Sequence, residues 1–328
     1  MITASQSSSH RITENIEQWV TQFERDGFLA LRGYFSADEI DCAIAATNNA
    51  LRTHAGEVVV DDLAINERTF LATARDPQNG RFKFNDLYLL LDELRALALA
   101  PELSLLLKRL LGGRTPVLCY SLTFEHGSGQ PIHIDSLYMT PKTPSHLLAT
   151  WIALEDVHPD AGPLVYYPGS HKIPLYRFED GTHHARQEEM DAWTAYITGE
   201  MAQRGIASQT FIARKGDLFI WHSDLVHGGS HIGDPTKTRR SLVCHYLTEQ
   251  DIRRTKNPQL REFNGAYWLD RLQPPVYTAP DRFGPDLPFP EELYLRRHPD
   301  VRAAVENGSI PSGFYHYERH GFGEKRPI

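Results

Sequence analysis

Residues 147–156 read Leu-Leu-Ala-Thr-Trp-Ile-Ala-Leu-Glu-Asp, an apolar run that ends in an acidic pair. The run belongs to a longer segment, from about Val117 to Thr248, in which short apolar stretches alternate with turns rich in Gly, Pro and Asp. Short strands separated by such turns are typical of all-β sandwiches and barrels. We therefore predict a mainly β fold with flanking helices, whose core is a double-sheet jelly roll of the cupin-like, double-stranded β-helix type.

A histidine and an acid lie two residues apart in His133-Ile134-Asp135, and a second histidine, His227, follows in a later segment. Side chains in a strand point to the same face at every second residue, so His133 and Asp135 can reach one ion together. His227 must then come from a different strand. Two imidazoles and one carboxylate leave positions open on the metal, as in non-haem Fe(II) oxygenases. The pattern predicts such a site, although His-x-Asp also occurs by chance in a chain with 16 histidines.

The order of the surrounding motifs resembles the phytanoyl-CoA dioxygenase family. The His-x-Asp segment is followed by the Trp-bearing run, by Gly-Pro-Leu at 162–164 and Pro-Gly-Ser-His-Lys at 168–172, by Lys-Gly-Asp at 215–217, by His227, and by an arginine before a last apolar strand. The resemblance implies Fe(II) held by His133, Asp135 and His227, with 2-oxoglutarate and O2 as co-substrates. It implies hydroxylation of a small-molecule substrate, with release of succinate and CO2.

The neighbouring residues Arg239 and Arg240 precede the last apolar strand. A planar guanidinium offers two parallel donors to a carboxylate, which suits an arginine to the distal carboxylate of 2-oxoglutarate. Strand alternation sends the two arginines to opposite faces without choosing between them, and matching Arg-x-Ser-Leu to the family favours Arg239. The resemblance also places Trp151 in the co-substrate pocket, with a plain core position as the alternative, and gives Lys83 a second polar contact to the keto acid.

Other outcomes and other protein classes would use the same residues. Desaturation, ring closure and demethylation need no change in the triad, whereas Asp135 disfavours halogenation because related halogenases replace this carboxylate with a small residue. A jelly-roll protein that binds a metabolite without turnover is the alternative from a different class. A zinc or nickel cupin would have no obvious use for Arg239.

The chain has 328 residues and a net charge of -8, with no basic run, so we expect neither a nucleic-acid partner nor an anionic membrane surface. We find no secretory signal and no apolar stretch of membrane-spanning length, and we expect a cytoplasmic location. The three cysteines show no metal or redox spacing and are assigned no function. The oligomeric state stays open.

We expect the oxygenase domain to cover residues 1–250, with a helical N-terminal part. In that part, Ser36-Ala37-Asp38-Glu39 matches a capping box that opens a helix. The segment 93–111, with a proline near its middle, predicts two short helices. The polar stretch 173–205 is interpreted as a lid over the substrate entrance, with a tolerated surface insertion as the alternative.

Residues 251–290 are rich in proline and are expected to form an extended connection. Residues 291–328 resemble a small helical module appended to bacterial proteins, notably glycosyltransferases of surface polysaccharide assembly. This resemblance suggests a bacterial source and a glycan- or carrier-linked substrate, and a plain helical brace is the alternative.

Overall fold

A large and a small β-sheet form the centre of the molecule. The computed structural model describes residues 4–285 and 287–328. The strands in it are β1 (Phe28–Leu31), β2 (Val59–Asp62), β3 (Glu67–Phe70), β4 (Phe82–Asn85), β5 (Pro116–Phe124), β6 (Leu147–Ala153), β7 (Leu164–Tyr166), β8 (Gln209–Phe211), β9 (Leu218–His222), β10 (His227–Gly229), β11 (Ser241–Thr248), β12 (Gln259–Phe263) and β13 (Ala266–Asp270).

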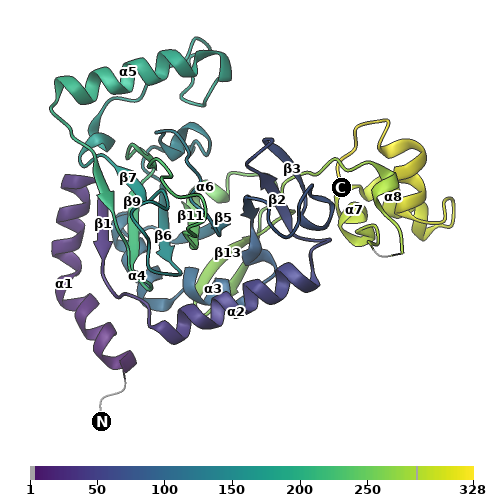
Figure 1. The fold of residues 1–328 in the computed structure, drawn as a ribbon, viewed down its shortest axis with the longest axis horizontal. Helices are drawn as coiled ribbons and strands as arrows, with labels where there is room; N and C mark the ends of the chain where they lie inside the picture. Colours follow the sequence, from purple (N-terminus) through teal and green to yellow (C-terminus); the bar gives the residue numbers. More distant parts are fainter. Residues whose placement is uncertain (1–3, 286) are drawn as a thin grey trace.

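The helices lie around these sheets (Figure 1). They are α1 (Ala4–Asp26), α2 (Ala37–Thr53), α3 (Asp92–Ala98), α4 (Pro101–Leu110), α5 (Met190–Gln203), α6 (Glu249–Ile252), α7 (Glu291–Arg297), α8 (Pro299–Glu306) and α9 (Gly313–His316). The predicted capping box is confirmed, because the Ser36 side chain accepts from the Glu39 amide and the Glu39 carboxylate accepts from the Ser36 amide. Pro101 divides the predicted helical segment into α3 and α4.

The larger sheet follows the strand order β1-β9-β6-β11-β5-β4-β2-β3, and the β12–β13 hairpin joins it beside β5. The smaller sheet has the order β10-β7-β8. Two facing sheets with mostly antiparallel pairing agree with the predicted jelly-roll core. The N-terminal strands extend the larger sheet, since β1 pairs with β9 and β4 pairs with β5.

Strand alternation in the larger sheet separates two apolar layers. Leu148 and Ile152 of β6 pack in the layer that holds residues of α2, α3 and α4. Ala149, Trp151 and Ala153 of the same strand face the smaller sheet. Because both faces are covered, the strand is apolar throughout rather than alternating, which explains the continuous run at 147–153. The inner layer between the sheets is where the candidate site lies.

The segment 173–205 contains α5 and packs behind the His-x-Asp segment. Phe178, Trp193 and Ile197 share an apolar cluster with Ile134, Leu137 and Val226, which adjoin the candidate metal ligands. The Ala185 amide donates to the Leu137 carbonyl oxygen at 2.8 Å. These contacts support the ligand-bearing segment from outside; the role of 173–205 as a lid stays a prediction.

The segment 251–290 differs from the predicted extended connection because it contains the β12–β13 hairpin. Asn264 and Gly265 both have positive φ, 51° and 78°, as a two-residue hairpin turn requires. Beyond the hairpin, α7 to α9 form a small module beside β2 and β3 (Figure 1). Val59 and Phe70 of these strands share an apolar cluster with the module, to which the C-terminal Ile328 also belongs.

Candidate metal centre and active site

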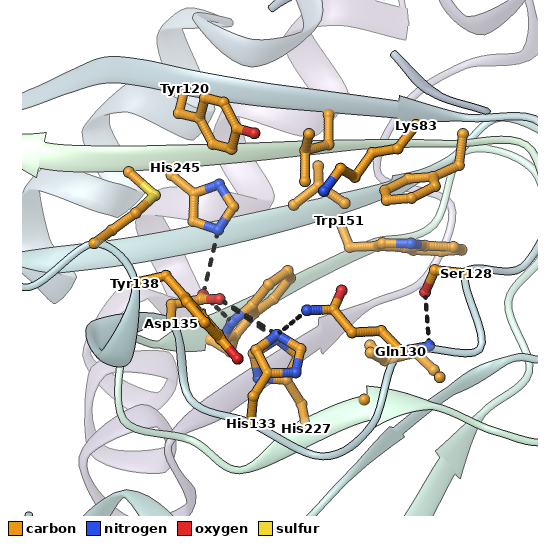
Figure 2. A pocket seen from close by; sticks show the side chains of 18 of the residues that line it. Lys83, Tyr120, Ser128, Gln130, His133, Asp135, Tyr138, Trp151, His227 and His245 are labelled. Atoms are coloured by element: carbon orange, nitrogen blue, oxygen red, sulfur yellow. Dashed lines mark hydrogen bonds and ion pairs between the residues drawn. The ribbon is translucent and has the colours of Figure 1, made fainter. Parts of the chain in front are cut away.

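His133, Asp135 and His227 come together at one end of the inner layer (Figure 2). One ligand atom from each of the three residues lies within 4.8 Å of the others, and all three residues are buried. The two histidines face each other across a bridge in which the His133 amide donates to the His227 carbonyl at 2.8 Å and the reverse bond is 3.0 Å. Asp135 begins a short 3₁₀ turn, Asp135–Leu137.

The Gly228-Gly229 pair after His227 permits this close approach of two backbones. A Cβ atom on Gly228 would lie 3.0 Å from the Gln130 carbonyl oxygen and 3.1 Å from the Ile132 nitrogen. Any larger residue would therefore push the His227 strand away from the segment that carries His133. The close approach of the two backbones therefore explains the glycine at position 228.

The orientation of both imidazoles is set by backbone carbonyls. His133 Nδ1 lies 2.9 Å from the Pro131 carbonyl oxygen, and His227 Nδ1 lies 2.9 Å from that of Leu225. A proton on each Nδ1 satisfies these bonds and leaves each Nε2 as an acceptor for a metal. Burial, followed by the nearby His227, lowers the pKa of His133 to about 4, so its ring is neutral at neutral pH. Neutral imidazole is the form that binds metals.

The Asp135 carboxylate is held by two groups on its far side. The Trp221 indole donates to Oδ2 at 2.8 Å, and His245 Nε2 lies 3.4 Å from the same oxygen. Oδ1 is left facing the His133 and His227 Nε2 atoms at 3.9 and 3.6 Å. Burial opposes ionisation of Asp135, but His245 and His227 outweigh it and hold the pKa of the carboxyl below its usual range. The donor set is thus two imidazoles and one carboxylate on one side of the site, which fits Fe(II).

His245 is a site residue that the sequence reasoning missed. It lies on β11, where Val243 and His245 line the cavity and Arg239 lies two residues before the strand, in the same alternation. The signal was present, since every second residue from the arginine onward should face the same way.

Among the residues that the structure describes, no carboxylate pairs with the buried cation Arg239. It is 4% exposed, and Nη1 donates to the Gly162 carbonyl at 2.8 Å, while Nε has no partner in the same part of the chain. Burial alone lowers the pKa of its guanidinium to about 10. Arg240 instead has a 37% exposed side chain that lies 3.8 Å from a carboxylate oxygen of Glu125. The two arginines differ as alternation predicts, and Arg239 is the one suited to bind an added carboxylate.

A model of one protein family, described as phytanoyl-CoA dioxygenase (PhyH), matches residues 23–238. The chain belongs to the phytanoyl-CoA dioxygenase family. The match includes the whole triad and stops one residue before Arg239. The sequence prediction of the family is therefore confirmed.

Relatives and solved structures agree with this membership. A mouse protein, phytanoyl-CoA dioxygenase domain-containing protein 1, is 25% identical over 314 residues, which cover 82% of this chain and 95% of that protein. The carbocyclase SnoK of nogalamycin biosynthesis, named as a non-heme, α-ketoglutarate-dependent enzyme, has a TM-score of 0.53 at 22% identity and covers 71% of this chain and 83% of its own. The epimerase SnoN of the same pathway has a TM-score of 0.54 at 21% identity, with 79% and 99% covered. These likenesses confirm the double-stranded β-helix fold.

The triad and Arg239 open onto one cavity of about 450 Å³. Trp151 lines it, and the Arg239 guanidinium carbon lies 6.0 Å from the centre of the Trp151 ring. Tyr138, Gln130 and Arg68 also line it and were not among the predicted site residues. None of the described residues that line the cavity comes from 173–205.

Lys83 lines the same cavity, but its ammonium group already has a partner. Nζ lies 2.9 Å from Asp61 Oδ2. Arg68 contacts the other oxygen of that carboxylate at 2.6 Å. The predicted contact of Lys83 with the keto acid therefore competes with an ion pair inside the protein.

No helix in the two described ranges, 4–285 and 287–328, combines the length and the apolar character needed to cross a membrane.

Proposed function

We propose that this protein is an Fe(II)- and 2-oxoglutarate-dependent dioxygenase that hydroxylates an unactivated carbon of a small-molecule substrate. The observation that carries the proposal is the pairing, in one cavity, of an open two-histidine, one-carboxylate cluster with a buried arginine that has no carboxylate partner among the described residues. The cluster accounts for the metal, and the arginine accounts for a dicarboxylate co-substrate. Neither a plain structural metal site nor an apolar binding pocket needs both.

His133, Asp135 and His227 would hold Fe(II) through two Nε2 atoms and Oδ1. When bound, the metal supplies the oxidation chemistry with O2 and 2-oxoglutarate, and succinate and CO2 are released. The protein contributes positioning: Arg239 binds the distal carboxylate of 2-oxoglutarate, and Trp151 forms an apolar wall beside it. Lys83 is a further candidate for contact with the co-substrate.

Hydroxylation is the default among several outcomes that this set of residues can support. Two proteins of similar fold are named a carbocyclase and an epimerase, so ring closure and related hydrogen-removing outcomes are alternatives for this chain. Desaturation and demethylation belong to the same group. A metabolite-binding protein without turnover is the alternative from a different class, and the intact cluster argues against it.

Oxygen-dependent succinate formation tests the proposal. Purified protein with Fe(II), 2-oxoglutarate and O2 is screened against small molecules, including glycan- and carrier-linked compounds, and products are examined for a gain of one oxygen atom by mass spectrometry. Asp135→Ala and Arg239→Ala are expected to lose succinate formation, and Arg240→Ala is expected to keep it. Equal succinate formation by the wild type and Asp135→Ala would overturn the proposal. The cytoplasmic location and the bacterial source remain predictions from the sequence.

A further inference from the structure

The charge of the cavity differs in sign from that of the chain. The protein carries a net charge of -8. Yet the described charged residues that line the cavity, apart from its histidines, are three cations, Arg68, Lys83 and Arg239, and one carboxylate, Asp135. A cavity with an excess of positive charge attracts anionic ligands.

Arg68 and Lys83 form a compact pair because they flank the same residue across three strands. Asp61 of β2 is the register partner of Arg68 on β3 and of Lys83 on β4. Arg68 Nε and Nη2 donate to the two Asp61 oxygens at 2.6 and 3.1 Å, and Lys83 Nζ lies 2.9 Å from Oδ2. These contacts with Asp61 leave Arg68 Nη1 and two N–H groups of Lys83 for another acceptor.

The three side chains are neither fully buried nor fully free. The Arg68 and Lys83 side chains are 37% and 26% exposed, and Asp61 is 15% exposed. Partial exposure places the cationic pair where the cavity meets solvent. Figure 2 shows Lys83 entering the cavity from the side opposite to His133 and His227.

The charges in the rest of the site cancel once its expected ligands are bound. Fe(II) and Arg239 together balance Asp135 and the two carboxylates of 2-oxoglutarate. Two cations that share one carboxylate then leave a single positive charge at the other side of the cavity. Apart from the candidate contact of Lys83 with the co-substrate, the proposed function does not use this charge.

We propose that Arg68 and Lys83 form a subsite for one acidic group, such as a carboxylate, of the primary substrate. The proposal rests on the proposed function and adds a substrate class to it: an organic acid whose acidic group lies at the cavity entrance while the carbon to be oxidised lies toward His133 and His227. It assigns Lys83 to the substrate in place of the co-substrate. A purely structural role of the ion pairs, in joining β2, β3 and β4, is the competing explanation.

Paired ligands test the subsite without knowledge of the natural substrate. Hexanoate, decanoate and 3-phenylpropionate, each with its primary amide, are titrated calorimetrically into the anaerobic holoenzyme that contains Fe(II) and 2-oxoglutarate. We expect at least one acid to bind about tenfold or more tightly than its amide, since a hydrogen bond to a charged group is stronger than a neutral one. The proposal is overturned if no acid binds more tightly than its amide.

Three variants and one control separate recognition from structure. Arg68→Gln and Lys83→Gln should lose the preference for the acid while their affinity for 2-oxoglutarate stays the same. Asp61→Asn removes the competing carboxylate and should strengthen acid binding; a folded Asp61→Asn protein with weaker acid binding would mean that the ion pairs are structural. Arg240→Gln, an arginine outside the cavity lining, should keep the wild-type preference.

Failure of the subsite and failure of the proposed function give different results. Binding of 2-oxoglutarate in the presence of Fe(II) is measured first in every variant. Loss of that binding in the wild type would refute the function itself. Normal 2-oxoglutarate binding without an acid preference would refute the anion subsite alone.

Discussion

Replacement of Arg239 by methionine should change co-substrate binding and protein stability to very different extents. Methionine has a similar length and no charge, and the site is 4% exposed. Loss of one partner from a buried, hydrogen-bonded charge pair costs about 2 to 5 kcal/mol. The affinity for 2-oxoglutarate should therefore fall by about 30-fold or more.

The effect on stability follows from the environment of the free arginine. Burial lowers the pKa of Arg239 to about 10, which corresponds to a cost of about 3 kcal/mol for keeping the charged group in the folded protein. The substitution removes this cost of burying a charge. It also leaves the Gly162 carbonyl without its donor, which costs about 1 to 3 kcal/mol. The free energy of unfolding should thus stay the same or rise by up to about 2 kcal/mol.

Two measurements check both halves of this prediction. Anaerobic calorimetry with Fe(II) present gives the 2-oxoglutarate affinity, and urea unfolding of the apoprotein gives the stability. Arg240→Met is the matched control and should change the affinity by no more than a few-fold, since its ion pair is exposed. Unchanged 2-oxoglutarate binding in Arg239→Met, or a stability loss larger than about 3 kcal/mol, would refute the reasoning.

Further predictions concern the metal cluster and its backbone. Trp221→Phe removes the indole donor to Asp135 Oδ2 and should weaken Fe(II) binding by about 10- to 100-fold in anaerobic titrations. An unchanged affinity would show that His245 alone holds the carboxylate. Gly228→Ala places a methyl group about 3 Å from the Gln130 and Ile132 backbones. It should lower the free energy of unfolding, measured in urea, by about 1 to 3 kcal/mol. Wild-type stability would mean that the segments carrying His133 and His227 separate easily. Fe(II) at 100 times its Kd should stabilise the wild type by about 2.7 kcal/mol in anaerobic thermal unfolding but not Asp135→Ala, and equal stabilisation of both would place the metal elsewhere.

The sequence was most informative where the spacing of two residues agrees with what a metal site needs. His133 and Asp135 are two residues apart. A 3₁₀ turn begins at Asp135 where a strand was expected, yet the ligand atoms of both residues still lie at the same candidate metal site. Arg239 could be chosen over Arg240 only by resemblance, because both faces of β11 are apolar and buried on different neighbours. The buried state of Arg239 supports this choice, and its contact with 2-oxoglutarate stays a prediction.

The parts that the sequence did not reveal depend on contacts between distant segments. The β12–β13 hairpin was missed although Asn264-Gly265 is a typical turn, because β12 is mostly exposed and its sequence lacks a clear apolar face. The sequence does not single out His245 because its contact with Asp135 joins residues that are far apart in the chain. The ion pairs of Asp61 with Arg68 and Lys83 likewise depend on strand register.

The most direct test of the central claim is an anaerobic titration of the apoprotein with Fe(II) and 2-oxoglutarate, followed by visible absorption. Chelation of Fe(II) by the keto acid produces a weak charge-transfer band, and we predict this band for the wild type and its loss in Asp135→Ala. A folded wild-type protein that binds Fe(II) but develops no band with 2-oxoglutarate would contradict the account.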